Sequence, residues 1–294
     1  MKAPHVVPYQ GSKRKLADDI LNIISDIEIE TLYEPFAGSA AITLAAAAND
    51  LAERYVIGDK FAPIPALWEM VVNTPQESAD EYETVWNQQL LDGVHEPEFS
   101  YDHFMNVRQD FNREQDPIQF LYLISRCVKN AIRFNGNGEF NQSPDKRRKG
   151  TNPKTVRTNM LSASRVLQGK TEFISGDFRD IIRNATSNDI VYMDPPWQGT
   201  STKKDTRYAF TLQIDELIEE MEDLNRRGVP FLLSFDGTCG DKSYGKELPQ
   251  HLNLQKIGLN AGKSSQAILL GRDDETIESL YLSPALIQKI TPVA

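Results

Sequence analysis

The chain has little of what marks secreted, membrane-spanning or zinc-stabilised proteins. Only two of its 294 residues are cysteines, Cys127 and Cys239, and their wide separation matches no metal-ligand spacing. No apolar run approaches the length of a membrane span, and residues 1–8 lack the basic-then-apolar pattern of a signal peptide. The four histidines are scattered, without a nucleophile or carboxylate at motif spacing. We therefore expect a cytoplasmic protein with no metal site and no membrane contact.

Several enzyme signatures are also missing. A G-x-G-x-x-G pattern does not occur, which disfavours a dinucleotide cofactor. No Pro-Cys dipeptide is present to supply the thiol nucleophile that attack at cytosine C5 requires. An Asp…Glu-x-Lys metal constellation of the restriction-nuclease kind is not recognisable either, so hydrolysis of DNA is disfavoured.

Positive charge is scarce overall but locally concentrated. The net charge is −10, yet residues 129–170 contain ten basic residues against two acidic ones, which gives this segment +8 and the remainder −18. A basic segment on an acidic body is the expected footprint of a protein that contacts a phosphate backbone along one face. A solvated charged loop is the plainer interpretation of Lys146–Lys149 taken alone.

The tetrapeptide Asp194-Pro195-Pro196-Trp197 follows an apolar run, Ile190–Met193, that predicts a buried parallel strand. Ligands bind at the carboxyl ends of such strands. Two prolines force the chain out of the sheet. This leaves the Asp194 carboxylate and the Pro195 carbonyl as acceptors for an amino group, with Trp197 as a stacking ring. Such acceptors favour a pyramidal amine with a free lone pair, suited to methylation by positioning and electrostatics.

A second element predicts a nucleoside site. A short strand and a Pro/Gly turn precede an Ala-rich helix from about residue 40 to 49, with Ser39 placed to cap it. Gly38 would allow a ligand to lie against the backbone. A further strand over residues 54–58 ends in Asp59, which lies 21 residues after Gly38. An acidic residue at about this offset meets ribose hydroxyls in nucleotide-binding α/β units.

These motifs, in this order, resemble the Dam-like alpha-group DNA N6-adenine methyltransferases, and the resemblance runs from Pro8 to Leu282. It implies S-adenosyl-L-methionine as cofactor, double-stranded DNA as partner, and an adenine flipped out of the duplex as target. The implied catalytic residues are Asp194, Pro195, Pro196 and Trp197. The implied cofactor-binding residues are Tyr9, Lys13, Glu34, Pro35, Phe36, Ala37, Gly38, Asp59, Asp177, Phe178 and Asp194.

The resemblance also implies roles within that site. Tyr9 and Lys13 would lie along the methionine part of the cofactor, with Lys13 near its carboxylate. Asp59 would bind the ribose, and Asp177–Phe178 would contact the cofactor adenine. The segment Asn135–Asn141 is similar to part of the family's target-recognition region. A cognate restriction endonuclease is a further functional partner that such a methyltransferase can have.

The sequence departs from the family pattern at three places. Ala40 replaces a glycine of the cofactor loop, Gly11-Ser12 replaces a glycine pair, and Trp197 replaces the usual Tyr. The larger ring leaves two alternatives open, an N4-cytosine DNA methyltransferase and an RNA N6-adenine methyltransferase. A third alternative, of a different class, is a catalytically silent DNA-binding subunit that keeps the fold. Intact Asp194 and Asp59 argue against the last.

The expected fold is α/β, a Rossmann-like methyltransferase sheet with an inserted, mainly helical DNA-recognition domain. Residues 1–60 and 170–294 would form the catalytic domain, and 61–169 the target-recognition domain. An amphipathic helix is predicted from Leu212 to Arg227. Strands are predicted at Thr171–Ile174, Ile190–Met193, Pro230–Phe235, Leu252–Ile257, Ala267–Leu270 and Leu280–Leu282, with an antiparallel end to the sheet.

Two segments are expected to contact DNA. Turn-forming residues at 135–138 predict a ribbon with flanks at 132–134 and 139–141, which can read base edges in the major groove. A loop over residues 198–210 is predicted to clamp phosphates, although an exposed flexible connection explains it equally well. The predicted DNA-binding residues are Arg133, Asn135, Asn137, Lys146, Arg147, Arg148, Lys149, Lys203, Lys204 and Arg207.

Overall fold

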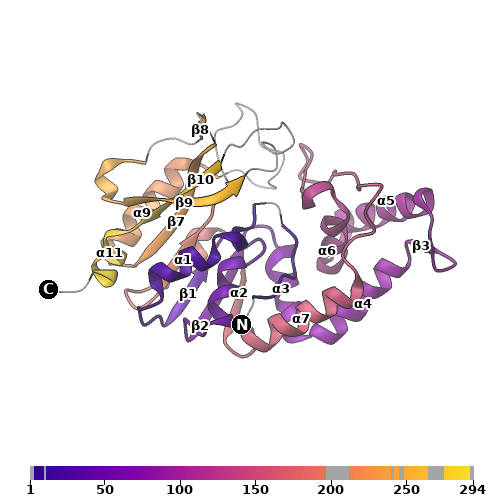
Figure 1. Ribbon diagram of the computed structural model, residues 1–294, viewed down its shortest axis with the longest axis horizontal. Coiled ribbons are helices and arrows are strands. Elements are labelled where there is room, and N and C mark those ends of the chain that lie inside the picture. Colours follow the sequence, from indigo (N-terminus) through magenta and orange to yellow (C-terminus); the bar gives the residue numbers. More distant parts are fainter. Residues whose placement is uncertain are drawn as a thin grey trace.

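A twisted mixed sheet with helices on both faces forms one end of the molecule, and a group of helices extends from it (Figure 1). The computed structural model describes residues 3–9, 11–196, 212–239, 242–244, 248–263 and 275–291. The strands are β1 (Thr31–Glu34), β2 (Arg54–Asp59), β3 (Leu90–Leu91), β4 (Val94–His95), β5 (Thr171–Ser175), β6 (Ile190–Met193), β7 (Phe231–Cys239), β8 (Lys242–Tyr244), β9 (Gln255–Lys263) and β10 (Glu275–Leu282).

The helices differ widely in length. The α-helices are α1 (Ala17–Ile24), α2 (Ala41–Ala48), α3 (Pro63–Asn73), α4 (Pro75–Asn87), α5 (Pro97–Glu114), α6 (Pro117–Arg126), α7 (Pro153–Leu167), α8 (Phe178–Ile181), α9 (Ile214–Arg227) and α11 (Pro284–Ile290), and the 3-10 helices are η1 (Lys13–Lys15), η2 (Val128–Asn130) and η3 (Gln250–Leu252).

The sheet has the order β5-β2-β1-β6-β7-β10-β9, and β8 pairs with β7. The first five strands of this order are parallel, with Tyr33 of β1 opposite Val56 of β2 and Val191 of β6. β10 runs antiparallel to both of its neighbours, as predicted for the end of the sheet. After β1, the chain adds β2 and then β5 on one side of it; after β6, it adds β7 and the later strands on the other side. The β1/β6 boundary is therefore a topological switch point, where open α/β sheets bind ligands.

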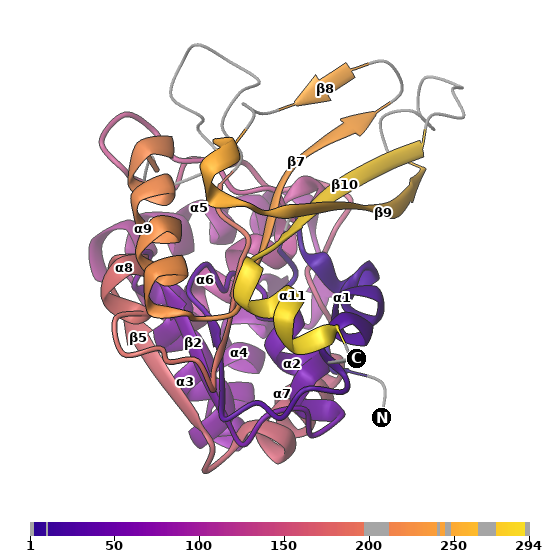
Figure 2. The same ribbon diagram turned by 90° about the vertical axis from the view of Figure 1, so that its left-hand side faces the viewer.

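Each central strand is buried on both faces. In β1, Leu32 joins a core cluster shared with α1, α2, α3 and α11, whereas Tyr33 joins a second cluster formed with α8 and α9. Figure 2 shows α9 on one side of the sheet and α1 and α11 on the other. This double burial explains why β1 and β6 read as nearly continuous apolar runs rather than as alternating ones.

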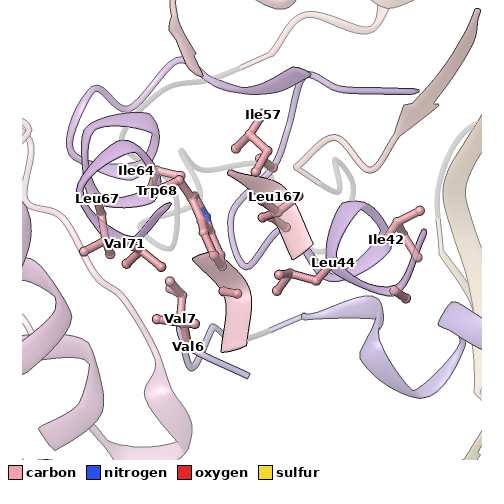
Figure 3. Close-up of a cluster of buried hydrophobic side chains, with 14 of the residues drawn as sticks. Val6, Val7, Ile42, Leu44, Ile57, Ile64, Leu67, Trp68, Val71 and Leu167 are labelled. Carbon is pink, nitrogen blue, oxygen red and sulfur yellow. The ribbon is translucent and has the colours of Figure 1, made fainter. Parts of the chain in front are cut away.

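The larger core cluster continues from the sheet into the helical segment. Trp68 of α3 is fully buried among side chains of α2, β2 and α7, including Ile42, Ile57 and Leu167 (Figure 3). Helices α5 and α6 lie farther from the sheet (Figure 1). The helical segment therefore rests on the sheet through α3 and α7 and projects α5 and α6 beyond it.

Most predicted elements are confirmed, with shifted ends. The helix expected from Leu212 begins at Ile214, because Gln213 caps it in a capping box with Glu216. Gly228, in the left-handed conformation, ends this helix. The predicted strands at 171–174, 190–193, 230–235 and 280–282 all lie in strands of the sheet.

One strand prediction is wrong in its first half. Residues expected to begin a strand at Leu252 instead end the 3-10 helix η3. Asn253 has φ 51°, a left-handed conformation that reverses the chain, so β9 begins only at Gln255. The strand expected at 267–270 lies outside the described residues.

Candidate active site

Acidic side chains gather at one edge of the sheet. Glu34 ends β1, Asp59 ends β2, and Asp194 follows β6 directly. Asp177 lies two residues beyond the end of β5. Because these strands are parallel, their carboxyl ends meet at the same edge of the sheet. The structure therefore brings together the predicted cofactor-binding acids and the catalytic motif.

Asp194 is held by Lys13. The Lys13 ammonium lies 2.7 Å from each oxygen of the Asp194 carboxylate, and only 7% of the Lys13 side chain is exposed. Burial raises the pKa of Asp194, and the Lys13 charge opposes that rise. Lys13, predicted to lie near the cofactor carboxylate, thus bonds the predicted catalytic carboxylate of Asp194. Pro195 and Pro196 then lead the chain out of the sheet, and Trp197 lies outside the described residues.

The loop after β1 has the backbone shape that its glycine predicts. Gly38 has φ +47°, and a Cβ atom there would lie 3.4 Å from the Tyr9 ring. Trp68 donates a hydrogen bond from Nε1 to the Gly38 carbonyl at 3.0 Å. Ser39 bonds to Ser12 through their hydroxyl oxygens at 2.8 Å. These contacts hold the amino-terminal segment and α3 against the loop, so Tyr9 lies beside the predicted cofactor site.

The predicted helix cap at Ser39 is wrong. Helix α2 follows Ala40, which has a left-handed conformation (φ 46°, ψ 41°), and Ser39 turns to Ser12 instead. Glu34 accepts a hydrogen bond from the Thr43 backbone N–H at 2.8 Å and takes over the capping function. Burial raises the pKa of Glu34 to about 7.

Asp59 ties the cofactor loop to the following segment. One carboxylate oxygen accepts the Gly38 N–H at 3.2 Å, and the other accepts the Phe61 N–H at 2.9 Å. Burial raises the pKa of Asp59 to about 6. A carboxylate has about four acceptor positions. Asp59 therefore keeps acceptor capacity for ribose hydroxyls while it fixes the loop.

Asp177 and Phe178 lie where two loops converge. Asp177 caps α8, and the adjacent Arg179 guanidinium lowers the pKa of this carboxyl to about 2. Lys60 adds an ion pair to Asp177 at 3.2 Å. The Phe178 ring lies 5.1 Å from the Phe36 ring, centroid to centroid. Phe36 is half-buried and Phe178 is buried, so Phe36 presents the more exposed ring of the pair; Pro35 and Ala37 are also buried.

The predicted hairpin is present in the helical segment. Phe134 bridges Phe140, and the Asn135 N–H donates to the Glu139 carbonyl at 2.9 Å. The side-chain oxygen Oδ1 of Asn135 accepts hydrogen bonds from the backbone N–H groups of Asn137 and Glu139, at 2.9 and 3.0 Å. Asn135 thus shapes the turn, whereas Arg133 and Asn137 are exposed.

The basic loop, residues 146–149, is fixed from below by a buried arginine. Arg126 is 1% exposed and donates hydrogen bonds to the side chains of Gln89, Ser100 and Tyr122. The Arg126 carbonyl accepts the Asp145 N–H at 2.9 Å, and Gln89 donates to the Lys149 carbonyl at 3.0 Å. The four basic side chains of the loop are all exposed. Their backbone is therefore anchored while their charges face solvent.

Phe61 joins the two parts of the site. Its N–H bonds Asp59, and its ring packs edge-on against Phe134 of the hairpin and Phe120 of α6, at centroid distances of 5.2 and 5.3 Å. The acid predicted to bind the cofactor ribose is thus two residues from a ring that supports the predicted DNA-reading hairpin.

Sequence reasoning missed three contributors. Glu278 lies 3.6 Å from the Lys13 ammonium, although it is remote in sequence. A charge inside an apolar stretch was the available signal both for Glu278, between Ile277 and Leu280, and for Arg126 at the end of an apolar helix. Phe61 gave no comparable signal, because one aromatic residue after a strand is ordinary.

The described part of the chain contains neither a cluster of metal-ligand side chains nor a membrane-spanning helix. No group of three or more His, Cys, Asp or Glu side chains there could hold a metal ion. None of the helices described is long and apolar enough to cross a membrane. The predicted clamp residues Lys203, Lys204 and Arg207 lie outside the described residues.

A doubly wound sheet with an acidic-proline motif after its switch-point strand defines the class of Rossmann-like methyltransferases. The chain belongs to the D12 class N6 adenine-specific DNA methyltransferase family, whose model matches residues 9–261.

The relatives differ in length. The chain is 27% identical over 234 residues to modification methylase StsI of Streptococcus sanguinis, covering 77% of this chain but 34% of that protein. It is 26% identical to the retron Ec67 DNA adenine methylase of Escherichia coli, covering 80% of each. It is 23% identical to the type II methyltransferase M1.LlaDCHI of Lactococcus lactis subsp. cremoris, covering 93% and 94%. The chain thus spans about a third of the first relative and nearly all of the last.

Proposed function

We propose that this protein transfers a methyl group from S-adenosyl-L-methionine to the N6 amino group of an adenine flipped out of duplex DNA. The observation that carries the proposal is the position of Asp194 and Pro195. They follow the switch-point strand β6, beside the loop held by Gly38 and Asp59, in a chain of the D12 family.

The residues at the sheet edge fit the cofactor. Gly38 presents a surface without a side chain next to the Tyr9 ring, and Asp59 retains acceptor capacity. Phe36 and Phe178 supply aromatic faces for the cofactor adenine. When bound, the cofactor supplies an electrophilic methyl group on a sulfonium. We propose that the cofactor is held by Tyr9, Lys13, Glu34, Pro35, Phe36, Ala37, Gly38, Asp59, Asp177 and Phe178.

The protein's own contribution is to bind and orient the target amine. Asp194 and the Pro195 carbonyl accept the two N6 hydrogens, so that the nitrogen lone pair is free for in-line attack. The proton lost from N6 passes to Asp194 or to solvent after transfer. No covalent enzyme intermediate is required. Trp197, which ends the same tetrapeptide, would stack on the flipped base.

We further propose that residues 61–169 form the DNA-recognition part. The exposed cations of the basic loop would neutralise phosphates, and Arg133 and Asn137 on the hairpin would reach base edges. Lys203, Lys204 and Arg207 would add phosphate contacts beside the flipped nucleotide. Because M1.LlaDCHI is named a type II methyltransferase, a cognate restriction endonuclease is the functional partner we propose.

The test is methyl transfer from labelled S-adenosyl-L-methionine to unmodified bacterial genomic DNA, followed by separation of the nucleosides and sequencing of the modified positions. We expect N6-methyladenine at one short motif. Detection of N4-methylcytosine would support the proposed mechanism but would show that the target base is cytosine and not adenine. Transfer to RNA alone, or cofactor binding without transfer, would overturn the proposal.

A further inference from the structure

Glu278 reaches the catalytic carboxylate from the antiparallel end of the sheet. It lies in β10, opposite Gly237 of β7, and the register of this pairing shifts between Glu278 and Leu280. Such irregularities occur near active sites, where they redirect a side chain. Leu280 belongs to the core cluster on the face that α1 covers, and Lys13 lies directly before α1.

One oxygen of Glu278 has no hydrogen bond within 3.5 Å to any of the described residues. Oε2 is buried from solvent and lies 3.6 Å from Lys13 Nζ, which is beyond hydrogen-bonding distance. A buried acceptor without a donor is destabilising, so its persistence calls for an explanation. The Lys13 ammonium, which lies 3.6 Å from this oxygen, is itself bonded to Asp194 at 2.7 Å.

The charges explain why an extra acceptor is useful. Lys13 is almost fully buried, and a buried ammonium without a carboxylate partner is costly. Lys13 contacts both oxygens of Asp194, so a turn of this carboxylate towards an incoming amine would lengthen at least one of the two contacts. Lys13 with Asp194 and Glu278 also carries a net charge of −1, which complements the positive sulfonium that the proposed function brings to this edge.

We propose that Glu278 is a positioning residue for methyl transfer: it holds the Lys13 ammonium while Asp194 turns its carboxylate to the target amine. This inference rests on the proposed function. Glu278 acts through Lys13 and does not touch the reacting atoms. An approach of Lys13 by well under one ångström would complete the hydrogen bond that Oε2 lacks.

The experiment compares single-turnover rates of methyl transfer at saturating cofactor and DNA. The isosteric change Glu278→Gln removes the charge, and we expect the rate to fall about tenfold or more, because a misplaced catalytic group alone can cost this much. The dissociation constant of S-adenosylhomocysteine, measured by calorimetry, should change less than about threefold, because only the chemical step depends on the exchange of partners. Glu53→Gln, an exposed control, should leave both unchanged.

The link to Lys13 is tested by a double-mutant cycle. In a Lys13→Met background, Glu278→Gln should add less than about a twofold loss, since its partner is gone. Glu278→Asp keeps the charge and should be faster than Glu278→Gln.

Three outcomes would overturn the inference. These are a Glu278→Gln rate within about twofold of wild type, an undiminished effect in the Lys13→Met background, or a Glu278→Asp variant slower than Glu278→Gln. An inactive wild-type protein would instead refute the proposed function, so the two failures are distinguishable.

Discussion

The sheet edge and the helical segment use buried charge in opposite ways. At the sheet edge the chemically important groups are themselves buried, and Lys13 bonds directly to Asp194. In the helical segment the buried charge, Arg126, faces away from solvent, and the exposed cations stand on a loop that it anchors. Burial raises the pKa of Glu34, Asp59 and Asp194 in the first region, whereas in the second it fixes the backbone that presents exposed charges. Substitutions should therefore affect chemistry in one region and stability or DNA affinity in the other.

The largest effect should follow Asp194→Ala. Loss of the acceptor for the target amine should lower the methyl-transfer rate by a factor of at least about 10² to 10³. The variant should still bind S-adenosylhomocysteine, measured by calorimetry, because Gly38 and Asp59 bond each other independently of Asp194.

Asp194→Ala also removes the carboxylate that bonds Lys13, so the urea midpoint of the variant should fall as well. Asp194→Asn is the matched control: it keeps the volume and one acceptor oxygen and should lose less stability. Methyl transfer by Asp194→Ala near the wild-type rate would show that the buried carboxylate has only a structural role. The contrast between the sheet edge and the helical segment would then fail.

The second effect is on stability. Arg126→Met fills a similar volume but removes the guanidinium hydrogen bonds to Gln89, Ser100 and Tyr122, which should lower the free energy of unfolding by about 2–4 kcal/mol. Urea denaturation measures this, and DNA affinity should fall because the basic loop loses its anchor.

Arg113→Met is the matched control for Arg126. Arg113 pairs with Asp110 and Glu114 at the surface, and its removal should leave the urea midpoint nearly unchanged. Equal losses for the two arginines would show that burial does not distinguish their roles.

The sequence was a good guide to the sheet edge and a partial guide to the rest. Strand ends and prolines could be located because Asp194 and Asp59 follow apolar runs, and the geometry of parallel strands then brings them together. The hairpin turn was predictable from its Asn and Gly residues. Glu34 as a helix cap was not predictable, because the left-handed conformation of Ala40 decides which side chain reaches α2.

Contacts distant in sequence were the main omission. Glu278 meets Lys13 only because β10 inserts between β7 and β9, and the ring of Phe61 meets the hairpin only through the packing of α6. No local pattern encodes either neighbour. Local chemistry therefore indicates which residues act, whereas tertiary packing determines which residues hold them.

The pH dependence of stability should reveal the buried acid at the sheet edge. The pKa of Glu34 is raised from 4.5 to about 7 by burial, so the folded state binds its proton more tightly than the unfolded state. The Glu34 contribution is therefore fully present below pH 4.5 and is lost as pH rises towards 7.

Glu34→Gln should remove this dependence, which is on the order of 3 kcal/mol across the window. Urea denaturation at several pH values measures it. Asp59, with a pKa raised to about 6, leaves a smaller slope of the same sign in the variant. Identical pH profiles for wild type and Glu34→Gln would show that Glu34 does not bind this proton, whereas the exposed control Glu53→Gln should retain the wild-type profile.

The smallest effect should come from single cations of the basic loop. The side chain of Arg147 is 94% exposed, and Lys146 is exposed beside it, so Lys146→Ala or Arg147→Ala should leave the fold unchanged. Loss of one phosphate contact should reduce, by about 1, the slope of the logarithm of the DNA-binding constant against the logarithm of the salt concentration. It should weaken binding similarly on all DNA sequences. Fluorescence anisotropy over a salt series measures this slope. Lys289→Ala on α11, which lies at the opposite end of the molecule (Figure 1), is the control and should retain the wild-type slope. If all three variants lost slope equally, the attraction would arise from the overall charge of the protein and not from a loop that Arg126 holds in place.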